Sequence, residues 1–369
     1  MKEQLKRITR YHELSALYKK YERALIPSML IFGVLVDFFT FKAISIRSSF
    51  ILLGIHALIA GVTIAYVNYY DSRRIETTSG LFRYVRLASP LLLQFSFGAL
   101  LSASLIFYWF SGVLSVSWPL MGLIIILIVA NDVFREYYMK PVVQLSVYFF
   151  ILFSISSLVV PYALNSISPW VFLLSGIVSI GLAVVYVTSL FRFLPHLRHE
   201  KKRLTIAITV IFLFMNALYF LNIIPPIPLS LREAGVYHDL VRVNGGYSVQ
   251  AEAESLLQKL APGQTIHTQP GRPIYVFTTI FAPADLDTEI IHHWQFYDTA
   301  ERRWVSRDEL SFTLFGGNET GYRGYSVKTS VEPGKWRVDV ETKRGQVLGR
   351  IPIRVHNVDE LPPLKSEFK

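Results

Sequence analysis

Three polar residues in the first part of the sequence could do chemistry inside a membrane, because Asp37, His56 and Asn216 all lie in long apolar stretches. Each is about six to eight residues from the same end of its stretch, which is roughly 9–12 Å along a helix. A carboxylate in hydrocarbon is costly and marks a functional site by default. An Asp–His pair supported by an amide would suit a proton or cation site in a transporter or channel. The alternative is a polar contact that fixes helix register, or a neutral Asp37 hydrogen-bonded to a neighbour.

A second set of candidate residues lies in two aromatic stretches, HHWQFYD (292–298) and GYRGYSVKT (321–329). An exposed tryptophan there would form a platform for a sugar or a peptide, with Arg323 and Lys328 as hydrogen-bond donors at its rim. The alternative is that Trp294 anchors a hydrophobic core. The binding candidates are His293, Trp294, Arg323, Tyr325, Ser326 and Lys328.

The sequence carries no catalytic signature. It has no cysteine, which excludes thiolate nucleophiles, zinc–thiolate sites and iron–sulfur clusters. It also lacks the nucleophile elbow, the phosphate loop, HExxH and the dinucleotide fingerprint. His292 and His293 are neighbours on an expected strand, so they point to opposite faces and cannot chelate one ion together. We therefore expect no catalytic residues, no metal and no cofactor.

The composition indicates a membrane protein. Only 17% of the residues are charged and 52% are hydrophobic, whereas soluble domains carry about 25% charged residues. Of the net charge of +10, residues 1–224 supply an excess of 11 and residues 225–369 a deficit of one. The C-terminal part therefore lacks the basic excess that nucleic-acid binding requires.

Seven apolar stretches are long enough to cross a bilayer, which takes about 20 residues. They are residues 24–46, 50–69, 88–110, 113–130, 142–163, 168–190 and 204–224. The loops on one side, together with residues 1–23, carry 18 Lys and Arg, and the loops on the other side carry two. This imbalance predicts a multi-pass inner-membrane protein with a cytoplasmic N-terminus and a periplasmic or extracellular C-terminal domain.

Residues 1–23 are basic and amphipathic. They are expected either to bind the anionic lipids of the inner leaflet or simply to extend the first span into the cytoplasm.

The C-terminal part should be β-rich. Residues 225–272 read as a linker with one short helix at 247–260, residues 273–357 have the period of two typical of strands, and residues 358–369 form a tail. Six strands are expected, at 274–281, 289–297, 310–315, 322–330, 335–342 and 346–355. They predict a small Ig-like β-sandwich after the seven-helix bundle. The core face of the fifth strand should carry Trp336, Val338 and Val340.

The motifs of this part resemble those of a bacterial domain-of-unknown-function family, whose members are membrane proteins that end in a β-rich domain. The positions that carry the resemblance are His293, Trp294, Arg323, Ser326, Lys328, Gly334, Trp336, Arg337 and Val338. The resemblance implies a fold and a location in the cell envelope, but no activity.

Three function classes remain. The favoured one is a non-enzymatic envelope protein whose outer domain binds a ligand, an envelope protein or a glycan. The second is a transporter or channel that uses Asp37, His56 and Asn216. The third is a membrane enzyme acting at the outer leaflet.

Overall fold

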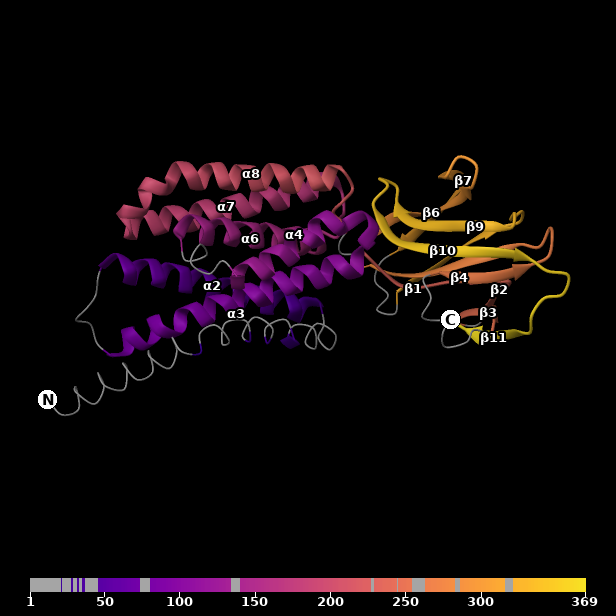
Figure 1. Cartoon of the computed structure of the whole chain (residues 1–369), viewed down its shortest axis with the longest axis horizontal. Helices are drawn as coiled ribbons and strands as arrows, with labels where there is room; N and C mark the ends of the chain where they lie inside the picture. Colours follow the sequence, from indigo (N-terminus) through magenta and orange to yellow (C-terminus); the bar gives the residue numbers. More distant parts are fainter. Residues whose placement is uncertain are drawn as a thin grey trace. The chain divides into compact units, whose positions relative to one another are not determined.

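The computed structural model contains two compact units (Figure 1). The residues that it describes are 46–73, 80–133, 140–226, 229–243, 245–253, 263–282, 286–315 and 321–369, with the single residues 21, 28, 32, 35 and 36. The first unit is helical and comprises Met1–Tyr108, Pro119–Ala163 and Ser168–Phe220. The second unit holds all the described strands and comprises Trp109–Trp118, Leu164–Ile167 and Leu221–Lys369.

Six α-helices and one short 3₁₀ helix are described. They are α2 (Ile46–Arg73), α3 (Gly80–Ser111), α4 (Leu114–Val133), α6 (Pro141–Ala163), α7 (Pro169–Phe193), η1 (Pro195–Glu200) and α8 (Lys201–Phe220). Five of them, all except α4 among the α-helices, are long and apolar enough to cross a membrane. The apolar part of α4, Leu114–Ala130, is shorter, and the expected first span at 24–46 lies almost wholly outside the described residues. Five of the seven predicted spans are thus supported as long apolar helices.

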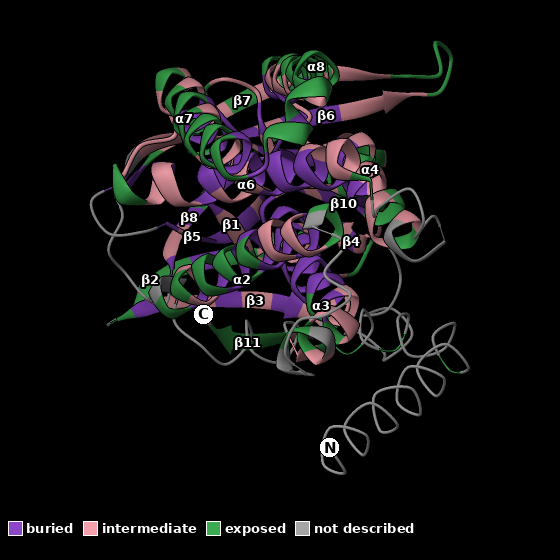
Figure 2. Cartoon of the chain, turned by 90° about the vertical axis from the view of Figure 1, so that its left-hand side faces the viewer, coloured by how far each residue is buried: buried purple, intermediate pink, exposed green. Residues whose placement is uncertain are grey.

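Helices α3 and α6 are the most buried of the five long helices, and α6 packs against α2, α7 and α8. Small residues allow this close packing: a Cβ on Gly176 of α7 would lie 2.8 Å from the Phe212 ring of α8. By contrast, α7 and α8 expose much of their surface (Figure 2). That surface is apolar, because Val185, Val210 and Leu213 are 67%, 58% and 61% exposed.

The second unit contains three sheets among its described strands. The strands are β1 (Ser230–Tyr237), β2 (Asp239–Val243), β3 (Gly246–Glu252), β4 (Gln264–Thr268), β5 (Ile274–Phe281), β6 (Asp287–Asp298), β7 (Arg303–Phe315), β8 (Tyr322–Lys328), β9 (Gly334–Thr342), β10 (Val347–Asn357) and β11 (Leu364–Phe368). Their orders are β1-β5-β8, β4-β10-β9-β6-β7 and β11-β3-β2. All neighbours are antiparallel except β4 and β10, which are parallel.

The β1-β5-β8 sheet contributes to two hydrophobic cores. Val276 and Ile280 of β5 belong to the larger core with Trp294, Trp336 and other residues of the five-stranded sheet. Phe277, which points the opposite way on the same strand, belongs to a smaller core with Val249 of the β11-β3-β2 sheet. The period of two thus lets one strand serve two cores.

The six predicted strands are all present, but the flanking regions, predicted as a linker and a tail, contain further strands. The expected linker at 225–272 contains β1 to β4, and the expected tail at 358–369 contains β11. The helix expected at 247–260 is the strand β3 as far as Glu252, and residues 254–262 lie outside the described part of the chain. The reason is that β3 pairs with both β2 and β11, and this pairing overrides the local helical pattern. The third sheet goes beyond the two-sheet Ig-like sandwich that we expected.

Candidate binding site on the five-stranded sheet

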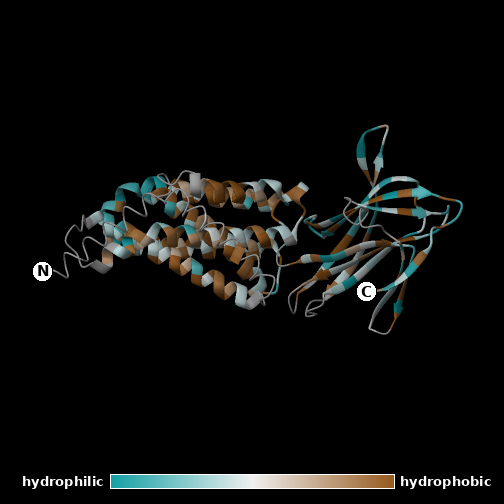
Figure 3. Cartoon of the chain, turned by 60° about the horizontal axis from the view of Figure 1, so that its bottom comes forward, coloured by the Kyte–Doolittle hydropathy of each residue, from teal (hydrophilic) through white to brown (hydrophobic). Residues whose placement is uncertain are grey.

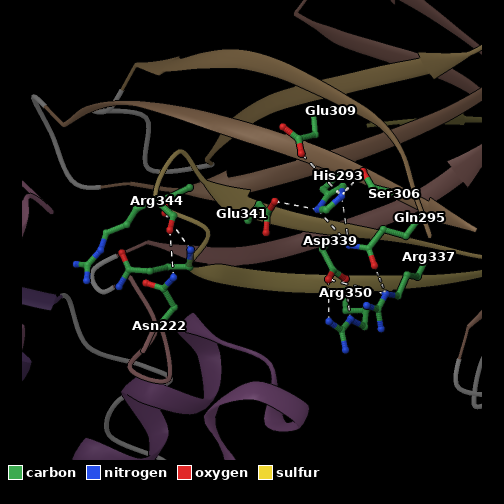
Figure 4. A network of polar contacts seen from close by, with 12 residues as sticks. Asn222, His293, Gln295, Ser306, Glu309, Arg337, Asp339, Glu341, Arg344 and Arg350 are labelled. Carbon is green, nitrogen blue, oxygen red and sulfur yellow. Dashed lines mark hydrogen bonds and ion pairs between the residues drawn. The ribbon is translucent and has the colours of Figure 1, made fainter. Parts of the chain in front are cut away.

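One face of the five-stranded sheet carries a connected set of polar side chains. Alternation along β9 sends Trp336 and Val338 into the core and Arg337 and Asp339 to the opposite face. The strand register brings further polar residues beside them, because Gln295 is opposite Arg337 and Arg350 is opposite Asp339. We call this surface the polar face and define it by His293, Gln295, Trp304, Arg337, Asp339, Glu341 and Arg350. Figure 4 shows all of them except Trp304.

Asp339 is the central acid of the polar face. Its carboxylate accepts two hydrogen bonds from Arg350, from Nε at 2.6 Å and from Nη2 at 2.7 Å, and its side chain is only 5% exposed. The hydrogen bonds with Asp339 raise the pKa of Arg350. Burial, and then the nearby positive charge of Arg350, lower the pKa of Arg337, whose Nε lies 4.0 Å from Asp339. The two arginines therefore share one buried countercharge.

His293 connects the next part of the polar face. Its Nδ1 lies 3.1 Å from a Glu341 carboxylate oxygen and 3.1 Å from Gln295 Nε2, and its Nε2 lies 2.8 Å from Ser306 Oγ. Burial raises the pKa of Glu341, and the charge of Asp339 adds to the rise, while His293 opposes it. His293 therefore links Glu341, Gln295 and Ser306 into one hydrogen-bonded group.

Arg337 forms the contact most suited to recognising a ligand. Its guanidinium carbon lies 4.4 Å from the centroid of the Trp304 ring, and its Nε donates to Gln295 Oε1 at 2.8 Å. No described residue accepts a hydrogen bond from its two terminal nitrogens. Trp304 in turn packs edge-on against Tyr297, with their centroids 5.2 Å apart. The half-buried pair of Trp304 and Tyr297 thus supports the guanidinium of Arg337, whose terminal N–H groups have no acceptor among the described residues.

The six binding candidates predicted from the sequence do not come together. His293 belongs to the polar face, whereas Trp294 is 0% exposed in the core and Ser326 is 5% exposed. The indole Nε1 of Trp294 donates to Ser326 Oγ at 3.1 Å. Trp294, Trp336, Val338 and Val340 are all core residues, so the core alternative holds for Trp294.

Arg323, Tyr325 and Lys328 lie on β8, where odd and even positions point to opposite faces. Arg323 Nη1 donates to the Gly245 carbonyl at 2.9 Å, and Tyr325, 44% exposed, packs edge-on against Tyr247. Lys328 points the other way and pairs with Asp308 while lying 5.3 Å from the Trp336 ring centroid. A common rim of Arg323 and Lys328 is therefore not formed.

Of the intramembrane candidates, Asp37 lies outside the described residues. His56 is buried, with Nδ1 2.9 Å from the Leu52 carbonyl of its own helix and its ring 5.6 Å from that of Phe95. Asn216 Nδ2 donates to the Phe212 carbonyl at 2.8 Å, and its Oδ1 is buried without a partner among the described residues. A shared site of these three residues stays a prediction.

Sequence reasoning missed Trp304, Gln295, Glu341 and Arg350 as members of a site. The signal was present in part, since the polar residues of β6, β9 and β10 all alternate with core residues. In the described part of the chain, no group of three or more His, Asp or Glu side chains is arranged to hold a metal ion.

The polar face lies entirely within one recognisable stretch of sequence. Residues 287–355 match the model of a family described as "Protein of unknown function (DUF2914)". The DUF2914 stretch runs from β6 into β10 and contains every residue of the polar face. It agrees with the predicted resemblance to an uncharacterised family and brings no activity with it.

Other comparisons add little. The comparison with curated proteins gave no match. A β-glucosidase from Listeria innocua in complex with gluconolactone is similar at 15% identity and a TM-score of 0.19, over 34% of this chain and only 16% of the glucosidase chain. The Pseudomonas fluorescens alkylpurine DNA glycosylase AlkC, bound to DNA containing an abasic site analog, has 10% identity and a TM-score of 0.22, over 82% of this chain and 97% of the other. Both TM-scores are too low to indicate a shared fold.

Proposed function

We propose that this protein is a multi-pass membrane protein whose β-rich unit binds an acidic saccharide of the cell envelope on the polar face. The membrane assignment rests on the five long apolar helices and on the apolar surface of α7 and α8. Soluble proteins rarely expose apolar patches of this extent, and lipid tails would cover them. Figure 3 shows hydrophobic residues along the middle of the helical unit.

The orientation follows from the ends of the helices. The connections α2–α3, α4–α6 and α7–α8 carry four, two and five Lys and Arg within residues 70–87, 131–141 and 191–203. The opposite ends carry the exposed tryptophans Trp109, Trp118 and Trp170, which suit a membrane interface. Because α7–α8 is the last connection before residue 221 and is one of the basic ones, the β-rich unit emerges on the opposite side if α8 crosses the membrane, whatever residues 24–46 do. By the positive-inside rule, that side is outside the cytoplasm.

The ligand class is inferred from the chemistry of the polar face. Aromatic rings such as Trp304 and Tyr297 pack on the C–H faces of sugars, and planar amide and guanidinium groups hydrogen-bond sugar hydroxyls. The terminal nitrogens of Arg337 form a fork that matches a carboxylate, which favours an acidic sugar over a neutral one. The single observation that carries the proposal is this arginine, which packs on Trp304 and has donors with no acceptor among the described residues.

The test is binding of a panel of matched neutral and acidic oligosaccharides to the full chain in detergent. The wild-type protein should bind acidic members more tightly. Arg337→Met removes the donors and should weaken that binding at least tenfold, or about 1.4 kcal/mol. Trp304→Ala should weaken binding to both kinds of sugar, because it removes the platform.

Arg242→Met is the matched control, because Arg242 is exposed on β2 and lies outside the polar face. It should leave saccharide binding unchanged. The proposal fails if no saccharide binds, or if Arg337→Met and Arg242→Met behave alike. The orientation is tested separately, by an alkaline-phosphatase fusion after Lys369, which should be active only outside the cytoplasm.

A further inference from the structure

The connection between α7 and α8 is a compact basic corner. Its sequence, FRFLPHLRHEKKR (191–203), contains five Lys and Arg, two histidines and a single acid. After α7 ends at Phe193, the 3₁₀ helix η1 runs from Pro195 to Glu200 and leads directly into α8 at Lys201.

Apolar anchors hold the backbone of this corner in place. Leu190, Leu194, Leu197 and Leu204 are between 2% and 4% exposed. The Leu194 amide donates to the Leu190 carbonyl at 2.8 Å, and the Leu197 amide donates to the Leu194 carbonyl at 3.0 Å. The corner therefore presents its outward side chains from a fixed scaffold.

Most of the outward polar side chains are basic, and all of these except Arg203 lack an acidic partner among the described residues. Glu200 pairs with Arg203 at 3.1 Å, and the remaining cations of the corner make no ion pair or side-chain hydrogen bond with a described residue. At the α2–α3 connection, by comparison, Arg86 is paired with Asp71 at 2.8 Å. The exposed, unpaired basic side chains of the corner are Arg192, His196, Arg198, His199, Lys201 and Lys202.

Apolar surface begins directly beside these charges. Phe193 is 74% exposed within the corner, and Val185 and Ile206, on the adjoining helices, are 67% and 54% exposed. Cations bordering an apolar helical surface match the boundary between headgroups and acyl chains, where anionic lipids attract Lys and Arg. A soluble polyanion would not account for the exposed phenylalanine.

We propose that this corner, residues 191–203, is a docking surface for anionic phospholipid headgroups. The cations hold the headgroup phosphate, and Phe193 inserts between the acyl chains. The proposal rests on the membrane placement proposed above, but it does not depend on which way the β-rich unit faces.

The test uses the full chain purified in a zwitterionic detergent and titrated with dioctanoyl phosphatidylglycerol or dioctanoyl phosphatidylcholine, with bound lipid counted by native mass spectrometry. The wild-type protein should bind phosphatidylglycerol at least tenfold more tightly. The triple variant Arg198→Gln, Lys201→Gln, Lys202→Gln should lose this preference. Replacing the same residues by Lys, Arg and Arg should retain it, because the charges are preserved.

The matched control removes three exposed charges elsewhere, as Arg242→Gln, Arg272→Gln, Arg354→Gln, and should keep the preference. The proposal is overturned if wild-type protein does not distinguish the two lipids, if the control loses as much as the corner variant, or if the charge-preserving variant also loses the preference. Glycerol phosphate at the same concentration should not compete, since it lacks acyl chains. Competition by it would mean a phosphate site rather than a lipid surface.

Discussion

Replacing Ser326 by alanine should strongly destabilise the β-rich unit, because this one hydroxyl serves two buried partners. Trp294 Nε1 can only donate, so Ser326 Oγ accepts from it at 3.1 Å, and the same oxygen is hydrogen-bonded to His292 Nδ1 at 2.8 Å. The other ring nitrogen of His292, Nε2, is hydrogen-bonded to Thr278 Oγ1, 3.0 Å away. This chain of bonds joins β5 and β8 of one sheet to β6 of another.

The size of the loss in stability follows from the two ring nitrogens left without a partner, Trp294 Nε1 and His292 Nδ1. Trp294 and His292 are both 0% exposed, and a buried polar group that loses its partner costs about 1–3 kcal/mol. Ser326→Ala should therefore cost about 2–6 kcal/mol, whereas a surface substitution stays within about 0.5 kcal/mol. Even the lower figure corresponds to a roughly thirtyfold loss of amide protection.

Hydrogen exchange followed by mass spectrometry on the full chain in detergent measures this locally, from peptides of β6 and β8. Ser366→Ala is the matched control, because Ser366 is an exposed hydroxyl of β11 that accepts from Gln250 Nε2 at 2.7 Å. It should change protection of β6 and β8 very little. If Ser326→Ala behaves like Ser366→Ala, the hydroxyl does not hold the two sheets together and the reasoning is refuted.

Three further predictions concern pH and packing. Burial lowers the pKa of His292 from 6.5 to about 3, so the unfolded chain binds more protons than the folded chain between these two pH values. The free energy of opening measured by amide exchange in β6 should therefore be highest above about pH 6.5 and fall by about 1.4 kcal/mol per pH unit below it. Equal protection at pH 7 and pH 5 would contradict this prediction. Arg350→Met should lower the free energy of urea unfolding of the β-rich unit by up to about 3–5 kcal/mol, since the buried Asp339 loses both of its hydrogen bonds from Arg350 and keeps only Arg337, 4.0 Å away. Adding Asp339→Asn should restore part of the loss, and no restoration would argue against the ion pair. Gly176→Leu should lower the melting temperature in detergent, because a Cβ at this position would lie 2.8 Å from the Phe212 ring. Gly181→Leu should not, because a Cβ at position 181 would meet nothing within 4 Å. Equal effects of the two substitutions would refute close packing at Gly176.

The sequence predicted the strands well because alternation is a local property. Five of the six expected strands contain buried residues of the large core, such as Val338 and Val340, and the strand expected at 322–330 adds the partly buried Tyr322. It failed for β3 because YSVQAEAESLLQKL (247–260) is also compatible with a helix, and one of the two partners of β3, β11, lies more than 100 residues further along the chain. The other partner, β2, is adjacent, and Asn244-Gly245 between the two strands was the local hairpin signal that the prediction missed.

The candidate site was predictable only in part, for a similar reason. A hairpin around Lys343-Arg344-Gly345 already brings Asp339 opposite Arg350, so that pair could have been found from the expected turn. The contact of Arg337 with Gln295 and Trp304 depends on β9 pairing with β6, and that order cannot be read from the sequence of either strand. Trp294 and Ser326 were misleading because a buried indole and its hydroxyl partner have the same residue types as a binding platform and its rim.

The adjacent histidines of β6 connect the core of the β-rich unit to its candidate site. His292 points inward, lies between Ser326 and Thr278, and is kept neutral by burial. Although it contacts a serine, it does not form a catalytic triad, because the pair is buried and no carboxylate orients the histidine. His292 is therefore a structural residue. His293 points outward to Glu341 and Gln295. Because the inward contacts fix the position of β6, the outward side chains are held by a rigid strand rather than by a loop, which is the arrangement that keeps a binding surface preorganised. Loss of the inner bonds should therefore weaken ligand binding without removing any residue of the polar face.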